Sequence, residues 1–219
     1  MSFYVCPGAN RPALKLLQAS SMVHCSERLP LAERARLFYE KVRPYRSRAE
    51  SLCERNDFKL GNNQFYLHLL ASSVETGLVV SVLSQLAAMF TGRTIGIWFV
   101  DHKLVKDFKL GVVVWVIDEK IALPANRFTV LPKVEKKKVF RLEYELSRKE
   151  MYLGFIMSKR SDAGGQALAG LYLIAKQLGL GRINYYVKEN NKNARQFYLH
   201  TDFGKPVDTD MVNWEVAVK

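Results

Sequence analysis

Residues 158–168, SKRSDAGGQAL, combine the residue types of an anion-binding loop. They follow an apolar run and precede a helix-like pattern, so they are predicted to join a strand to the start of a helix. The first N–H groups of a helix have no partner within it, and the helix dipole adds positive charge there. Gly164 and Gly165 let the backbone approach a phosphate closely. Lys159 and Arg160 add full charges, so the loop is predicted to bind a phosphate-rich ligand.

A second stretch, residues 183–203, predicts a strand, a polar turn and a short helix. Asn191 is suited to cap this helix, because its side-chain oxygen can accept a hydrogen bond from a free backbone N–H. Ala194, Phe197 and Tyr198 follow at spacings that place them on one helix face. An ordinary amphipathic helix with an aromatic pair in the core has the same pattern, so the pattern alone leaves the function open.

The run from Asn191 to Phe203, NKNARQFYLHTDF, resembles the last motif of a known family. This is the GNAT superfamily of acyl-coenzyme A-dependent N-acetyltransferases, whose motif reads roughly N-x-x-A-x-x-F-Y-x-x-x-G-F. Two positions depart from the family pattern: Asp202 replaces the usual Gly, and Asn193 stands where Arg is frequent.

The loop at residues 158–168 occupies the place of the pyrophosphate-binding motif of that family, Q/R-x-x-G-x-G/A. Residues 165–167, Gly-Gln-Ala, match the second half of this motif, whereas Asp162 stands where Gln or Arg is usual. A carboxylate beside a diphosphate is unfavourable, which puts cofactor affinity in question. The order strand, loop, helix, strand, helix is that of the family.

The resemblance implies transfer of an acyl group, usually acetyl, from coenzyme A to an amine. The backbone of residues 155–158 is then expected to pair with the pantetheine arm as an extra strand, and amides of residues 163–168 to hold the diphosphate. Contacts with the cofactor, acetyl-coenzyme A or another acyl-coenzyme A, are expected from Phe155, Ile156, Met157, Ser158, Ala163, Gly164, Gly165, Gln166, Ala167, Leu168, Asn191 and Asn193.

Two side chains are implied to be catalytic by the same resemblance. Tyr198 aligns with the tyrosine that protonates the departing thiolate in many members, although a core tyrosine is the alternative. Glu150 lies where members often place the carboxylate that takes a proton from the incoming ammonium. Glu143 and Glu145 are rivals for this role, and a solvated carboxylate is the alternative for Glu150.

Apolar periodicity predicts the elements that must position these residues. Helices are predicted at residues 31–52, with a kink near Pro44, and at 74–90, with a short one at 13–20. Strands are predicted at 94–100, 110–117, 139–146, 151–158, 183–187, 203–207 and 212–218, with a shorter one at 127–131. Residues 56–63 are predicted to form a break, 64–73 fit a strand or a helix, and 101–109 a hairpin loop. Residues 151–158 are nearly all apolar, which is typical of a strand covered on both faces.

The resemblance, which covers about residues 94–219, implies an α/β (α+β) fold. We expect a GNAT-like mixed, mostly antiparallel central sheet flanked by helices. Residues 91–219 would form the acyltransferase core, and residues 1–90 a helical N-terminal region that supplies the first helices.

The chain is strongly basic, with 33 Lys and Arg against 21 Asp and Glu, a net charge of +12. Such a charge favours anionic partners. Arg43, Arg46 and Arg48 belong to a basic face of the first predicted helix and are candidates for a surface that binds nucleic acid or an acidic protein. A solvated helix face is the alternative.

Three functions therefore remain open. The first is an acetyl-coenzyme A-dependent N-acetyltransferase whose amine acceptor is not identified, with a tilt towards an anionic macromolecule. The second is a catalytically inactive GNAT-fold module that binds nucleic acid or an acidic partner. The third is an acyltransferase that modifies a nucleic acid itself.

The remaining signals bear on the compartment and on metals. The three cysteines form no C-x-x-C pair and the four histidines stand alone, so no metal site is expected. The N-terminus lacks the pattern of a signal peptide, and no apolar run reaches the roughly 20 residues of a membrane span. We expect a cytoplasmic protein that does not enter a membrane.

Overall fold

The computed structural model describes residues 29–71, 74–101, 110–119 and 137–219. Its elements are, in chain order, α2 (Leu31–Glu50), β1 (Asp57–Leu60), β2 (Asn63–Leu70), α3 (Thr76–Met89), β3 (Thr94–Val100), β4 (Leu110–Ile117), β5 (Lys138–Leu146), β6 (Glu150–Ser158), α5 (Ser161–Gln177), β7 (Arg182–Tyr186), α6 (Lys192–His200), β8 (Lys205–Pro206) and β9 (Asn213–Ala217).

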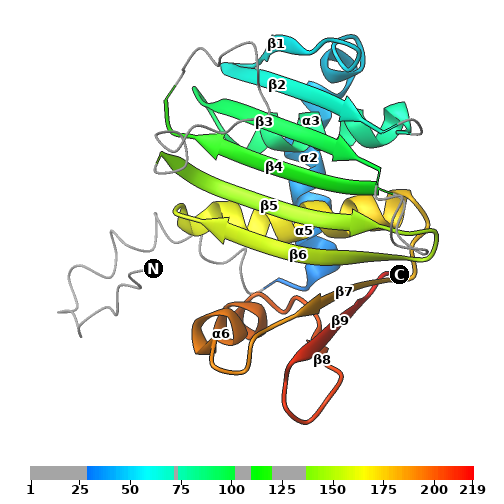
Figure 1. Ribbon diagram of the computed structural model, residues 1–219, viewed down its shortest axis with the longest axis vertical. Coiled ribbons are helices and arrows are strands. Elements are labelled where there is room, and N and C mark those ends of the chain that lie inside the picture. The colour runs from blue at the N-terminus through cyan, green and yellow to red at the C-terminus, as the bar shows by residue number, and fades with distance from the viewer. Residues whose placement is uncertain (1–28, 72–73, 102–109, 120–136) are drawn as a thin grey trace, which may run out of the picture.

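Nine strands of the described ranges form one sheet in the order β1-β2-β3-β4-β5-β6-β7-β9-β8 (Figure 1). Neighbouring strands are antiparallel except in two places, β2 beside β3 and β6 beside β7. The fold is therefore the predicted α/β class with a mixed, mostly antiparallel sheet.

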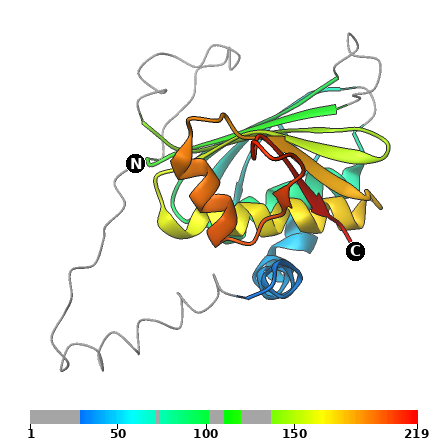
Figure 2. The same ribbon diagram turned by 90° about the horizontal axis from the view of Figure 1, so that it is seen from below.

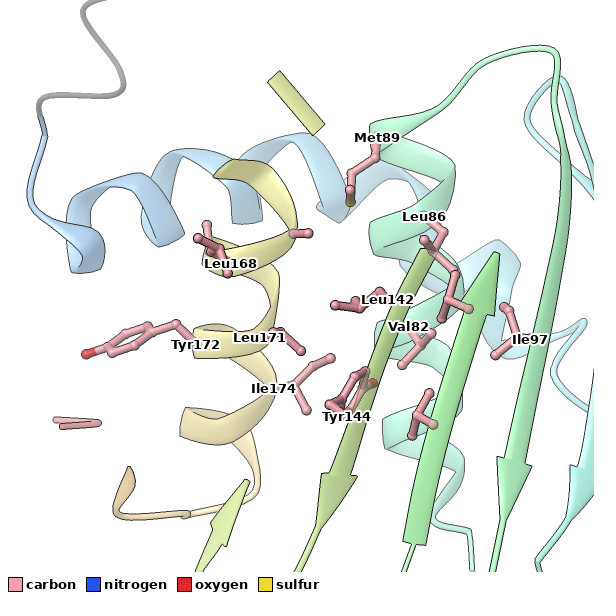
Figure 3. Packing of buried hydrophobic residues seen from close by; sticks show 14 of the residues in the cluster. Val82, Leu86, Met89, Ile97, Leu142, Tyr144, Leu168, Leu171, Tyr172 and Ile174 are labelled. Atoms are coloured by element: carbon pink, nitrogen blue, oxygen red, sulfur yellow. The ribbon is translucent and has the colours of Figure 1, made fainter. Parts of the chain in front are cut away.

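The helices α3 and α5 lie against one face of the sheet, and α2 crosses them on the side away from the sheet (Figure 2). Alternate residues of a strand point to the same face, so Leu142 and Tyr144 of β5 both point into the core. There they meet Val82 of α3 and the residues Leu171 and Ile174 of α5 (Figure 3). Each such aliphatic side chain contributes about 1.5–3 kcal/mol by its burial.

The first described helix, α2, is joined to the last, α6, by Arg34. This side chain is 8% exposed, and its guanidinium donates hydrogen bonds to the carbonyl of Thr201, which ends α6, and to that of Leu29 at 3.0 Å. The carbonyls of the last turn of a helix have no partner within the helix. Arg34 therefore satisfies one of them and fixes the end of α6 against the start of α2.

The predicted strands 94–100 and 110–117 are confirmed at both ends, and the hairpin pairing of β3 with β4 follows. The predicted break at residues 56–63 is wrong, because Asp57–Leu60 forms β1. The ambiguous residues 64–73 contain most of strand β2. The N-terminal region, expected to be mainly helical, thus also supplies two strands of the common sheet. The hydrophobic alternation of β1 extends over only four residues, which is too short to be recognised in the sequence.

Some predictions fall outside the described residues: the short helix at 13–20, nearly all of the loop at 101–109, and the strand at 127–131. In the part of the chain that is described, no helix has the length and apolar character needed to cross a bilayer. The same ranges contain no cluster of three side chains of the types that bind metal ions.

Candidate functional site

Strands β6 and β7 run parallel for a short distance and then separate (Figure 1). Their pairing covers only Glu150–Leu153 of β6 and Arg182–Tyr185 of β7, whereas β6 continues to pair with β5 as far as Ser158. In the described part of the chain, residues 155–158 have no partner strand on the side of β7. A free strand edge of this kind can pair with an extended ligand.

A bulge lies where the two strands separate. The register between β5 and β6 shifts between Glu143 and Tyr144, which face Phe155 and Leu153. Gly154 is the extra residue of β6 at this point. A bulge bends its strand and increases the local twist, so it accounts for the divergence. A glycine inside a strand pattern is a known signal for a bulge, and the sequence contains that signal.

Beyond the bulge, the apolar side chains of β6 are no longer buried. Met151 and Leu153 are 0% and 3% exposed, but Phe155 is 43% exposed, with the guanidinium of Arg141 5.2 Å from its ring centre. The prediction that residues 151–158 are covered on both faces is therefore wrong for the second half. Ile156 and Met157 are half-buried there, so an apolar edge borders the gap between the strands.

Helix α5 begins at Ser161, earlier than the sequence predicted. The predicted loop thus shrinks to Lys159 and Arg160, and the glycine pair lies inside the helix. The first-turn amides without an intrahelical partner belong to residues 161–163. The expected set of amides, 163–168, is corrected accordingly, because those from residue 164 onward bond to carbonyls of the preceding turn.

The two glycines differ in their surroundings. A Cβ added to Gly164 would lie 3.1 Å from the ring of Phe197, so this position lets α6 pack closely against the start of α5. A Cβ added to Gly165 would meet nothing within 4 Å. Gly165 therefore leaves open space beside the N-terminus of α5, as a site for a bulky anion requires.

Asp162 lies in the first turn of α5, and its carboxylate interacts with side chains close to it in the sequence. Its carboxylate accepts hydrogen bonds from Arg160 at 3.3 Å and from Gln166 at 3.1 Å. A negative charge in the first turn is stabilised by the helix dipole, as a bound anion would be. Asp162 thus competes with an anionic ligand, while Arg160 offsets part of its charge.

The helix α6 presents Tyr198 towards β7. As predicted, Asn191 caps the helix: its oxygen accepts a hydrogen bond from the N–H of Ala194 at 3.1 Å. Tyr198 is 6% exposed. The centroid of its ring lies 4.4 Å from that of Tyr185, and the rings of Phe203 and Trp214 also contact it. Tyr185 in turn donates a hydrogen bond to the carbonyl of Phe203.

Burial raises the pKa of the Tyr198 phenol well above its ordinary value. A phenol is protonated at neutral pH even at its ordinary pKa, so the higher pKa keeps the proton on Tyr198 but makes it a weaker proton donor. No hydrogen bond joins its hydroxyl to another described residue. The sequence alone had not indicated the aromatic cluster around Tyr198, because its members come from three separate elements.

The three candidate carboxylates have different partners. Glu150 accepts hydrogen bonds from Arg182 at 2.6 Å and from Asn184 at 2.9 Å. Glu143 is paired with Arg141. Glu145 faces Tyr152 across the β5–β6 pairing, and its charge contributes, after burial, to the raised pKa of that phenol.

No cation among the described residues pairs with Glu145. It is thus the least neutralised of the three, while Glu150 would have to release Arg182 before it could take a proton. Glu150 remains the candidate that the family motif predicts.

The predicted basic surface divides into two parts. Arg43 and Arg48 are exposed on α2, whereas Arg46 is half-buried. Arg46 lines a pocket between α2, α3 and α5, on the side of the helix layer that faces away from the sheet. The three arginines therefore do not form one uniform surface. The candidate cofactor contact Asn193 lies on another element, exposed at the start of α6.

No protein-family model matches the chain, and no curated protein shows significant sequence similarity to it.

Proposed function

We propose that the protein is an acyl-coenzyme A-dependent N-acyltransferase of the GNAT type, most simply an acetyltransferase. The separation of β6 from β7 at Gly154, directly before a strand-to-helix turn, is the observation that carries this proposal. It provides a free strand edge and a helix N-terminus in continuous sequence. A long ligand with an amide-bearing arm and a diphosphate needs both features at this spacing.

The residues would divide the binding work along the length of the ligand. The free edge at 155–158 offers backbone groups to the pantetheine amides, and Phe155 offers an apolar ring. The amides of residues 161–163, together with Arg160, would meet the diphosphate, and Gly165 leaves room for it. Acetyl-coenzyme A supplies the activated acyl group: its C–S bond breaks as the C–N bond to the amine forms.

Proton transfer would fall to two side chains. Tyr198 gives its proton to the departing thiolate and is held in place by the rings of Tyr185 and Trp214. A carboxylate takes the proton that the ammonium must lose before it can attack. Glu145 has no competing cation in the described ranges, whereas Glu150 lies where members of the family often place a carboxylate. Holding the reactants together accounts for much of the rate in such direct transfers.

The rival function is an inactive module of the same fold that binds nucleic acid or an acidic partner. One observation favours it: Asp162 occupies the first turn of α5, where an anion would otherwise be stabilised. An acyltransferase that acts on nucleic acid would combine both signals. Crosslinking of the full-length protein to cellular RNA and DNA distinguishes these cases from a small-molecule acceptor.

Thermal unfolding with and without acetyl-coenzyme A tests the proposal. At about 100 times its Kd, the ligand should add about 2.7 kcal/mol to the free energy of unfolding. Coenzyme A should stabilise the protein as well, whereas pantetheine, which lacks the diphosphate, should stabilise it less. No stabilisation by either coenzyme A compound at saturating concentrations would exclude the acyltransferase and favour the rival function.

Two substitutions of Gly165 provide a matched control. Gly165→Ala and Gly165→Leu both replace a helical glycine and should stabilise the fold by up to about 1 kcal/mol. Only the leucine projects far enough into the open space to obstruct a diphosphate. We expect Gly165→Ala to bind acetyl-coenzyme A like the wild type, and Gly165→Leu to bind it at least tenfold more weakly.

A further inference from the structure

A pocket of about 260 Å³ opens where α2 crosses α3 and α5, on the side of the helix layer opposite the sheet. This volume is near the lower end of the range for small-molecule sites, about 300–1,000 Å³. The pocket is lined by Tyr39, Val42, Arg46, Ser81, Ser84, Gln85, Leu173, Lys176 and Gln177. None of these residues belongs to the candidate acyltransferase site.

The floor of the pocket is polar although it is buried. Ser81 donates a hydrogen bond to the side chain of Gln177 at 2.6 Å, and Ser84 donates one to a backbone carbonyl of its own helix at 2.6 Å. Gln85 is only 9% exposed, yet no other described residue forms a hydrogen bond with its amide. The amide atoms of Gln85 are not among the enclosed polar atoms that lack a partner, so they are open to solvent in the pocket and can bind a polar group of a ligand.

The position of Gln85 is enforced by a close helix approach. A Cβ at Gly170 of α5 would lie 2.5 Å from the side-chain oxygen of Gln85. The absence of a Cβ at Gly170 thus leaves room for the side chain of Gln85 between α3 and α5.

The mouth of the pocket is cationic. Arg46 is half-buried and Lys176 is exposed, and no carboxylate appears among the lining residues. The acidic residues near the start of α2 interact with Arg36 instead. Glu33 accepts a hydrogen bond from the Arg36 guanidinium, and the charge of Glu40 contributes to the raised pKa of that group. Two positive charges at the mouth thus lack a carboxylate partner in the described ranges.

The walls between the mouth and the floor are apolar. Val42 of α2 and Leu173 of α5 contribute aliphatic surface, and Tyr39 contributes an aromatic ring. A ligand that matches this lining carries a negative group at one end and a short apolar body. Its polar contacts would be with the cations Arg46 and Lys176 and with the amide of Gln85.

We propose that this pocket binds a small amphiphilic monoanion, a short-chain carboxylate, with its carboxylate at Arg46 and Lys176. Its apolar chain lies between Val42 and Leu173. The inference is independent of the proposed acyl transfer, because the pocket and the free edge of β6 lie on different elements.

The test uses hexanoate as a probe and follows the backbone amide signals of the full-length protein by NMR. We expect saturable shifts confined to residues near 39–46, 81–85 and 173–177. The uncharged analogue 1-hexanol and the cationic analogue hexylamine should produce neither the pattern nor the saturation. Equal shifts with 1-hexanol would show that the cations do not select the ligand and would overturn the proposal.

Charge variants provide the matched control. Arg46→Gln and Lys176→Gln should each weaken hexanoate binding by about tenfold, the effect of losing one charge-assisted hydrogen bond. Arg48→Gln removes the same charge from an exposed position of α2 outside the pocket lining and should leave the affinity unchanged. Absence of saturable shifts in the wild type, or equal losses in all three variants, would refute the site.

Stabilisation by acetyl-coenzyme A should be the same in these variants as in the wild type. A loss of hexanoate binding with coenzyme A binding intact, or the reverse, therefore separates the fate of this proposal from that of the acyltransferase.

Discussion

The two halves of β6 have similar apolar sequences but different surroundings. Residues 150–153 are flanked by β5 and β7 and bury Met151 and Leu153 almost completely. Among the described residues, β5 is the one strand that flanks residues 155–158, and Phe155 is exposed there. We call these the closed half and the open half of β6.

The difference shows that apolar sequence in this strand serves two purposes. In the closed half it contributes to the core, since Tyr144 and Tyr185 lie opposite Leu153 on the two neighbouring strands. In the open half it forms an edge without a protein partner in the described residues. An apolar edge that is kept exposed beside a helix N-terminus is expected at a ligand site rather than in a structural core.

The largest effect should come from shortening one apolar side chain in each half. Leu153→Ala, in the closed half, should lower the free energy of unfolding by about 2–5 kcal/mol because it leaves a cavity. Phe155→Ala, in the open half, should cost less than about 1 kcal/mol but weaken acetyl-coenzyme A binding. Urea denaturation measures both values. A loss of stability in Phe155→Ala as large as that in Leu153→Ala would contradict the distinction between the halves.

The next effect concerns the phenol of Tyr198 on α6, which packs against β7. Tyr198→Phe keeps the ring packed on Tyr185 and should reduce acetyl transfer by about one to three decades, with cofactor binding nearly unchanged. Thiol release from acetyl-coenzyme A with a mixture of amine acceptors measures the rate. Tyr172→Phe is the control, because the hydrogen bonds of this hydroxyl within the described residues are made with Lys219. Full activity of Tyr198→Phe would remove the general-acid role.

A smaller effect is expected at Tyr144 of β5, which lies opposite Leu153 of the closed half. The hydroxyl of Tyr144 is enclosed without a hydrogen-bond partner, and burial raises the pKa of this phenol. Tyr144→Phe removes the unsatisfied group and should stabilise the protein by about 1 kcal/mol or more.

The difference in the free energy of unfolding between Tyr144→Phe and the wild type should also depend on pH, which provides a second measurement. In the unfolded chain, Tyr144 loses its proton above about pH 10, whereas in the folded protein it keeps the proton. The stability that this residue contributes is therefore complete below pH 10 and falls above it by about 1.4 kcal/mol per pH unit. Tyr144→Phe lacks this loss, so its advantage should grow at alkaline pH. A constant difference from pH 8 to 11 would contradict the burial of the phenol.

The smallest effect should come from the start of α5. Asp162→Asn removes a negative charge from the first turn and frees Arg160, so acetyl-coenzyme A should bind about two- to fivefold more tightly. Isothermal titration at low salt measures the change. Asp57→Asn, at the far edge of the sheet in β1, makes the same substitution and should have no effect. Weaker binding in Asp162→Asn would show that the carboxylate contributes to the site.

The sequence was informative where local pattern decides the structure. The runs at 94–100 and 110–117 are continuous apolar segments with β-branched and aromatic residues, and both are strands over the predicted length. The cap at Asn191 also depends on neighbouring residues alone, and it is present. These features require no information about distant parts of the chain.

Features that depend on distant contacts were missed. The exposure of Phe155 is decided by the end of β7 pairing, not by the composition of β6. Helix α5 starts before the glycine pair, because helix formation at residues 161–165 is stabilised by packing of Phe197 against Gly164. The partners of Glu150 and the pocket at Gln85 likewise arise from elements far apart in the sequence.

The contact between Arg34 and the end of α6 has a consequence for biosynthesis. It joins positions 167 residues apart, so α2 leaves the ribosome long before the carbonyl that its guanidinium requires. The apolar stripe of α2 packs against both α3 and α5, so its cover is complete only once α5 has been made. Domains whose contacting residues are far apart in the sequence fold slowly, and their hydrophobic surface stays exposed until folding is complete. The nascent chain is therefore expected to need chaperone protection until its last thirty or so residues have emerged.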